Sequence, residues 1–100
     1  MKKTNQSANG TSFHDTTFTA TVAELRKILG EPQCEQNDGQ DKCNFDWTME
    51  TEDGTVFTVY DWKEYRRLEE DEEIEWHIGG RSRLDTEKAL TEIVVDLFDL

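Results

Sequence analysis

The dipeptide Asp53-Gly54 lies between two segments in which apolar and polar residues alternate, and this pattern constrains the fold more than any other feature. Residues 45–52 and 55–60 have the two-residue period of β-strands with one buried face. Asp-Gly between such strands is a strong signal for a tight hairpin turn. The sequence therefore predicts two adjacent antiparallel strands joined by a two-residue turn.

A two-residue turn would place Glu52 opposite Thr55 and would set the register of the whole hairpin. One face would then carry a ladder of mainly aromatic pairs. The pairs are Phe45 with Trp62, Trp47 with Tyr60, Met49 with Thr58 and Thr51 with Val56. This ladder is either part of the core or an exposed platform for a base, a sugar or a protein partner.

The other face of the same hairpin would pair Asp46 with Asp61, and two facing carboxylates repel each other. We expect this repulsion to be relieved by fraying at the strand ends, by a cation such as Lys63, or by a divalent metal. The remaining pairs on that face would be Thr48 with Val59 and Glu50 with Phe57.

Two segments have the apolar spacing of amphipathic helices. The first begins at a capping box, Thr21-Val22-Ala23-Glu24, and ends at Gly30 and Pro32. The second follows Gly79-Gly80 and is capped by Ser82 or Asp85. Its expected apolar stripe consists of Leu84, Ala89, Leu90, Ile93, Val94 and Leu97.

Further strands are expected at residues 13–20 and 74–78, so the elements follow the order β-α-β-β-β-α. This order predicts an α+β fold, with a mainly antiparallel sheet of three or four strands and two amphipathic helices on one face. A chain of 100 residues is expected to form one domain, here residues 13–100. Residues 1–12 are polar and are expected to form a disordered tail.

The formal charge of −12 disfavours direct binding to DNA, RNA or anionic membranes and favours a basic partner. No apolar run has the roughly 18 residues of a membrane span, and the polar start lacks the apolar core of a signal peptide. We therefore expect a cytoplasmic protein.

Catalytic and metal-binding motifs are not evident. The serines Ser7, Ser12 and Ser82 lie outside any nucleophile elbow. The spacing of Cys34 and Cys43 with the two histidines matches no zinc motif. We expect neither enzymatic activity, nor a metal, nor a cofactor.

Two groups of residues are candidates for binding. The first is an acidic run that would face a basic partner: Glu69, Glu70, Asp71, Glu72 and Glu73. The second would hold an anionic nucleotide through cations, glycine backbone and a stacking aromatic ring. It consists of Trp62, Lys63, Arg66, Trp76, His77, Gly79, Gly80 and Arg81.

Three stretches carry a resemblance to a known group of proteins: Gly30-Glu31-Pro32, residues 53–63, and Trp76-His77-Ile78-Gly79-Gly80. Together they resemble small uncharacterised proteins encoded by bacteriophages, over roughly residues 21–95. The resemblance implies an origin in a phage or prophage and a cytoplasmic setting in an infected bacterium. It implies no activity.

These observations leave three functional hypotheses. The chain is a non-catalytic counter-defence inhibitor whose acidic surface blocks a basic, nucleic-acid-binding site on a host protein. Alternatively, it sequesters a nucleotide-like signalling ligand. As a third hypothesis, it is a structural or assembly accessory that forms a homodimer through the aromatic face or through Phe98 and Leu100.

Overall fold

A computed structural model of the protein describes residues 1–40 and 43–100. It contains a sheet in which the described strands pair antiparallel, in the order β1-β4-β5-β6-β2, with β3 also paired to β4. Two helices complete the α+β fold that the sequence predicted. The elements are β1 (Lys2–Lys3), β2 (Ser12–Thr21), α1 (Val22–Leu29), β3 (Cys34–Glu35), β4 (Phe45–Glu50), β5 (Val56–Tyr60), β6 (Glu73–Gly80) and α2 (Arg83–Phe98).

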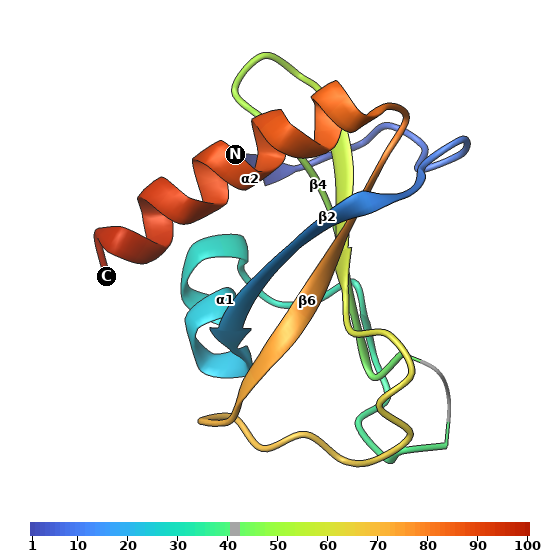
Figure 1. Ribbon diagram of the computed structural model, residues 1–100, viewed down its shortest axis with the longest axis vertical. Helices are drawn as coiled ribbons and strands as arrows, with labels where there is room; N and C mark the ends of the chain where they lie inside the picture. Colours follow the sequence, from blue (N-terminus) through green and yellow to red (C-terminus); the bar gives the residue numbers. More distant parts are fainter. Residues whose placement is uncertain (41–42) are drawn as a thin grey trace.

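The four longer strands and both helices occur in the expected order, but the sheet has six strands rather than three or four. The two additional strands, β1 and β3, are two residues long and pair with β4. Both helices contact the same side of the sheet, to the left of the strands in Figure 1. The other side is the open face of the sheet.

The N-terminal segment differs from the tail that we expected at residues 1–12. In the structure β1 pairs with the end of β4, and the Met1 amino group lies 3.3 Å from Glu52 and 3.2 Å from Glu92. Arg81 binds the same segment, since its guanidinium donates to the carbonyls of Ser7 and Asn9. The segment between α1 and β4 contains β3, and residues 41–42 of this segment lie outside the described residues.

The register of the β4–β5 hairpin corrects our prediction. The backbone N–H of Thr51 donates to the carbonyl of Thr55, and the N–H of Gly54 donates to the carbonyl of Thr51. The loop therefore has three residues, 52–54, and closes on Gly54 at a φ of 84°. Trp47 faces Val59 and Met49 faces Phe57, so every residue of β5 lies on the opposite face from the one expected.

This register divides the predicted aromatic ladder between two faces. Phe45, Trp47 and Met49 are buried beneath the helices, where they meet Phe57 and Val59 instead of Tyr60 and Trp62. The two carboxylates also no longer face each other directly, because Asp46 lies opposite Tyr60 and not opposite Asp61.

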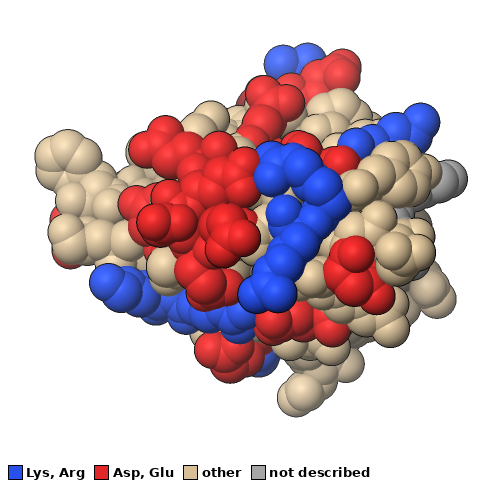
Figure 2. Space-filling model, turned by 90° about the horizontal axis from the view of Figure 1, so that it is seen from below, with Lys and Arg blue, Asp and Glu red and all other residues tan. Residues whose placement is uncertain are grey.

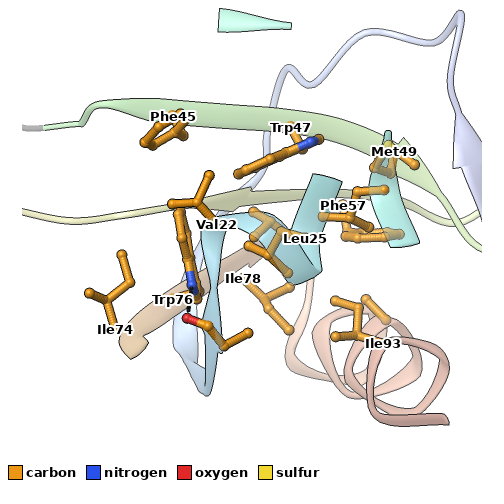
Figure 3. Close-up of a cluster of buried hydrophobic side chains, with 14 of the residues drawn as sticks. Val22, Leu25, Phe45, Trp47, Met49, Phe57, Ile74, Trp76, Ile78 and Ile93 are labelled. Atoms are coloured by element: carbon orange, nitrogen blue, oxygen red, sulfur yellow. Dashed lines mark hydrogen bonds between the residues drawn. The ribbon is translucent and has the colours of Figure 1, made fainter. Parts of the chain in front are cut away.

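The core lies between the sheet and the two helices. Figure 3 shows Val22 and Leu25 of α1 among the side chains of β4, β6 and α2. Trp47 and Trp76 meet edge to face with their centroids 5.6 Å apart. Each indole donates to a backbone carbonyl, Trp47 to Gly30 and Trp76 to Ala20, so neither buried N–H lacks a partner.

The helix ends agree with the sequence. Thr21 and Glu24 form the capping box of α1 with hydrogen bonds of 3.1 and 2.8 Å, and Gly30 ends this helix at a φ of 82°. Ser82 caps α2 by accepting from the N–H of Asp85. The apolar stripe expected on α2 is only partly right, because Leu84 and Val94 are exposed.

Candidate functional site

The open face of the sheet carries the side chains that alternate with the core residues of β4, β5 and β6. They include Thr48, Thr58, Tyr60 and His77, which neither helix covers. Four rings on this face line one open pocket: Phe13, Tyr60, Trp62 and His77. We call these four residues the aromatic pocket.

The rings of the aromatic pocket form a row in which each ring contacts the next. Phe13 stacks on His77 with centroids 4.4 Å apart and an interplanar angle of 23°. His77 lies 5.7 Å from Tyr60, and Tyr60 meets Trp62 edge to face at 6.5 Å. Phe13 and Trp62 remain 39% and 42% exposed, so apolar ring surface is accessible to a ligand.

A bulge in β2 brings Phe13 to this pocket. Phe13 pairs with Gly79 and Thr17 pairs with His77, so residues 14–16 lie opposite Ile78 alone. Asp15 has a φ of 64° at the centre of the bulge. Thr16 anchors it, because its hydroxyl lies 2.7 Å from that of Thr86 on α2. The bulge therefore places a ring from the edge strand against His77.

The two glycines of β6 are required by packing on opposite sides of the sheet. A Cβ on Gly79 would collide with the hydroxyl of Thr58 on the open face. A Cβ on Gly80 would lie 2.8 Å from the Thr86 methyl group, where α2 crosses the sheet. The pair therefore allows close contact within the protein.

Asp46 is the acidic residue that lies beside Tyr60 and Trp62 of the aromatic pocket. It lines a second hollow with Thr58 and Gly79, and this hollow shares Tyr60 and Trp62 with the aromatic pocket. The Asp46 Oδ1 atom is buried and has no hydrogen-bond partner among the described residues. Burial, and next the negative charge of Asp61, raise the pKa of the Asp46 carboxyl.

The predicted acidic run lies at the end of the connection between β5 and β6 and includes Glu73, the first residue of β6, at the bottom of Figure 1. We call residues 69–73 the acidic loop. Arg26 binds Glu70 through two nitrogens at 2.9 and 3.1 Å, and Arg66 binds Glu72 at 2.9 Å. Glu69, Asp71 and Glu73 are exposed and form no salt bridge with the described residues.

The predicted nucleotide site is only partly assembled. Trp62, Lys63 and His77 lie on or beside the open face, with the Lys63 ammonium 5.7 Å from the centre of the Trp62 ring. Trp76 is buried in the core, where no ligand can stack on it. Gly80 faces α2.

The expected cations also diverge. Arg66 binds Glu72 just before β6, whereas Arg81 follows β6 and binds the N-terminal segment. The eight residues of β6 separate these ends by roughly 25 Å at about 3.3 Å per residue. One nucleotide cannot contact both arginines.

Sequence reasoning missed Phe13, Tyr60 and Asp46 as members of one site. Phe13 reaches the site through a bulge, for which the sequence carries no clear signal. Tyr60 and Asp46 share the open face because the hairpin loop has three residues. A three-residue loop that ends in glycine was the available alternative to a two-residue Asp-Gly turn.

Comparisons with protein-family models, with curated proteins and with solved structures found no match. The resemblance to bacteriophage proteins therefore stays a prediction. Among the described residues no His, Cys, Asp and Glu side chains form a group of three that could hold a metal ion. Neither described helix is long and apolar enough to span a membrane.

Proposed function

We propose that the protein is a non-catalytic binding protein whose acidic loop docks on a basic surface of another protein. The observation that carries this proposal is the exposure of three carboxylates in the acidic loop, those of Glu69, Asp71 and Glu73. These three exposed carboxylates lie close together in the chain, Glu69 and Asp71 before β6 and Glu73 at its first residue, and have no basic partner among the described residues. Their charge is therefore available to a basic surface.

The acidic loop is held in place by hydrogen bonds immediately before it and at its second residue, Glu70. Asn37 and Leu68 exchange two hydrogen bonds of 2.7 Å immediately before the loop. The Glu70 carbonyl accepts from the N–H of Ala23 in the first turn of α1. A preorganised loop loses less conformational entropy on binding, which favours affinity.

Acidic side chains outnumber basic ones on the surface around the loop (Figure 2). Figure 2 shows this end of the molecule, where Asp and Glu side chains cover much of the face and Lys and Arg side chains lie among them. With a net charge of −12, the chain attracts basic proteins and repels nucleic acids. We infer that the loop occupies a site that otherwise binds nucleic-acid phosphates.

The bacteriophage origin implied by the sequence suggests which partner to seek. We propose a nucleic-acid-binding protein of the bacterial host, and a counter-defence role in which its basic site is blocked.

The test of this proposal is capture from bacterial lysate with the full chain as bait. We expect nuclease-treated lysate to yield a DNA- or RNA-binding protein that elutes as salt rises. The triple variant Glu69→Gln, Asp71→Asn, Glu73→Gln should lose it. Glu87→Gln, Asp96→Asn, Asp99→Asn, on α2 and its C-cap, removes the same charge elsewhere and should retain the partner. Equal capture by both triple variants would contradict the role of the loop.

Sequestration of a nucleotide is supported by fewer residues, because Arg66, Trp76, Gly80 and Arg81 lie outside the aromatic pocket. It predicts a nucleotide mass in native mass spectrometry of protein isolated from infected cells. Such a mass would replace the docking proposal as the main function.

An assembly role through the end of α2 has one supporting observation. Phe98 and Leu100 are 89% and 57% exposed, although both are strongly apolar. Sedimentation velocity of the wild type and of Phe98→Ser would test it. A dimer that the substitution dissociates would support this role.

A further inference from the structure

We propose that the aromatic pocket and Asp46 together form a receptor for one basic side chain, a lysine or an arginine, presented by a partner protein. The inference deepens the proposed function and rests on it for the source of the side chain. The preference for a cationic ligand follows from the rings and the carboxylate alone.

The rings of the aromatic pocket favour a cation. A lysine ammonium or an arginine guanidinium is attracted to the negative face of an aromatic ring, most strongly to tryptophan and tyrosine. Tyr60 and Trp62 lie edge to face, and Phe13 and His77 extend the apolar wall. The aliphatic stem of a basic side chain can therefore pack on rings while its head reaches a polar end.

Asp46 supplies that polar end. Its hollow shares Tyr60 and Trp62 with the aromatic pocket, and its Oδ1 atom is buried without a hydrogen-bond partner among the described residues. A half-buried carboxylate with an unpaired oxygen is costly, and a cation that enters the hollow beside this carboxylate removes part of the cost. The same carboxylate would repel a phosphate group.

The structure already contains a cation beside the pocket. The Lys63 ammonium lies 5.7 Å from the centre of the Trp62 ring. An incoming basic side chain is repelled by this ammonium and has to displace it, whereas an incoming phosphate would be attracted to it. Substitution of Lys63 therefore changes affinity in opposite directions for the two ligand classes.

The size of the pocket agrees with a single side chain. Its volume of about 330 Å³ lies at the lower end of the range for small-molecule sites, which is about 300–1,000 Å³. Trp62 lies in the same connection between β5 and β6 as residues 69–72 of the acidic loop, so one basic partner can contact both. The acidic loop would attract the partner, and the pocket would select one of its side chains.

The experiment measures binding of a nona-arginine peptide at fixed pH and salt. We expect Trp62→Ala and Asp46→Asn each to weaken binding about tenfold. Lys63→Gln should strengthen it by about threefold, since a competing charge is removed. Phe98→Ala removes an exposed aromatic ring outside the pocket and should leave the affinity unchanged.

Two results separate this inference from the proposed function. If the acidic-loop triple variant loses the peptide while Trp62→Ala and Asp46→Asn bind it like the wild type, the pocket proposal is overturned and the docking proposal stands. If the wild type does not bind the peptide, the docking proposal loses its support.

In that second case the pocket is tested by itself. The Trp62 indole N–H signal is followed by NMR during titration with Nα-acetyl-arginine methylamide and, separately, with adenosine monophosphate. A shift with the arginine derivative that Asp46→Asn abolishes supports the receptor. No shift with it, or a shift with the nucleotide alone that Lys63→Gln weakens, overturns the receptor.

Discussion

Asn44 and Asp61 are joined by two hydrogen bonds: the backbone N–H of Asn44 lies 2.8 Å from Asp61 Oδ1, and its side-chain amide lies 3.0 Å from Oδ2. Oδ1 also accepts from the N–H of Phe45 at 2.9 Å. Asn44 directly precedes β4 and Asp61 directly follows β5, and both are buried. The pair therefore closes the hairpin at the end opposite its loop.

Asp61→Ala should lower the free energy of unfolding by about 3 kcal/mol, because it leaves two buried backbone N–H groups without their acceptor and removes one of the two acceptors of the Asn44 amide. Urea denaturation at neutral pH measures this change. Asp71→Ala, in the exposed acidic loop, is the control and should change stability by no more than about 0.5 kcal/mol. Similar effects of both substitutions would contradict the structural role of Asp61.

Asp46→Asn should raise the free energy of unfolding at pH 7 by less than about 1 kcal/mol, because it removes a half-buried charge whose cost is reduced by solvent screening. Burial, followed by the charge of Asp61, raises the pKa of Asp46, so the folded protein binds this proton more tightly than the unfolded chain. The penalty is present above the folded-state pKa and disappears as pH falls below the unfolded value of about 3.9. Urea denaturation should show a higher free energy of unfolding for Asp46→Asn than for the wild type at pH 7, and no difference at pH 3.5.

Asp53→Asn provides the control of opposite sign. Hydrogen bonds from Thr51, and then from Thr55 and Lys88, lower the pKa of Asp53. Ionised Asp53 therefore contributes stability above the unfolded pKa, and this contribution declines as the pH falls toward the folded-state value. This substitution should destabilise the protein at pH 7, with a smaller effect in acid. If Asp46→Asn and Asp53→Asn changed the free energy of unfolding at pH 7 in the same direction, the opposite effects of burial on Asp46 and of hydrogen bonding on Asp53 would be contradicted.

Gly79→Ala should destabilise the protein by about 2 kcal/mol, because its Cβ would collide with the Thr58 hydroxyl across β5 and β6. Thr58→Ala removes the colliding atom and should restore most of this loss in the double variant. The measurement is a double-mutant cycle by thermal or urea denaturation. Additive effects of the two substitutions would rule out this contact as the reason for the glycine.

Arg26→Lys should cost about 1 kcal/mol although it conserves charge. The Arg26 guanidinium binds Glu70 through two nitrogens, also binds Glu31 and Glu35, and lies 5.5 Å from the centre of the Phe45 ring. A lysine ammonium cannot reproduce this planar geometry. Arg83→Lys is the matched control, since Arg83 is more exposed and pairs only with Glu87 among the described residues. Denaturation curves that shift equally for both variants would argue against the network.

Much of the fold follows from local signals. The capping box at Thr21 and Glu24, the glycine at position 30 and the cap at Ser82 are encoded within a few residues, because helix ends are satisfied by nearby side chains. The α+β class follows from the order of periodic segments. The acidic loop was recognised because a run of like charges remains in solvent.

The candidate pocket was not predictable in the same way. The bulge at Asp15 depends on Thr16 meeting Thr86 from the opposite end of the chain, and the position of Arg81 depends on an N-terminal segment with no apolar pattern. Both require contacts over more than 60 residues of sequence, which local propensity does not encode.

The β4–β5 hairpin shows most clearly which features the sequence determines and which depend on the tertiary structure. Alternation in residues 45–60 and the Asp-Gly dipeptide determined that two strands pair here, since both signals are local. They did not determine whether two or three residues form the loop, and a change of one residue moves the whole of β5 to the other face. Burial decided it: the observed register places Phe57 and Val59 against the helices and leaves Tyr60 beside Asp46, because this arrangement buries the apolar side chains of both strands on one face.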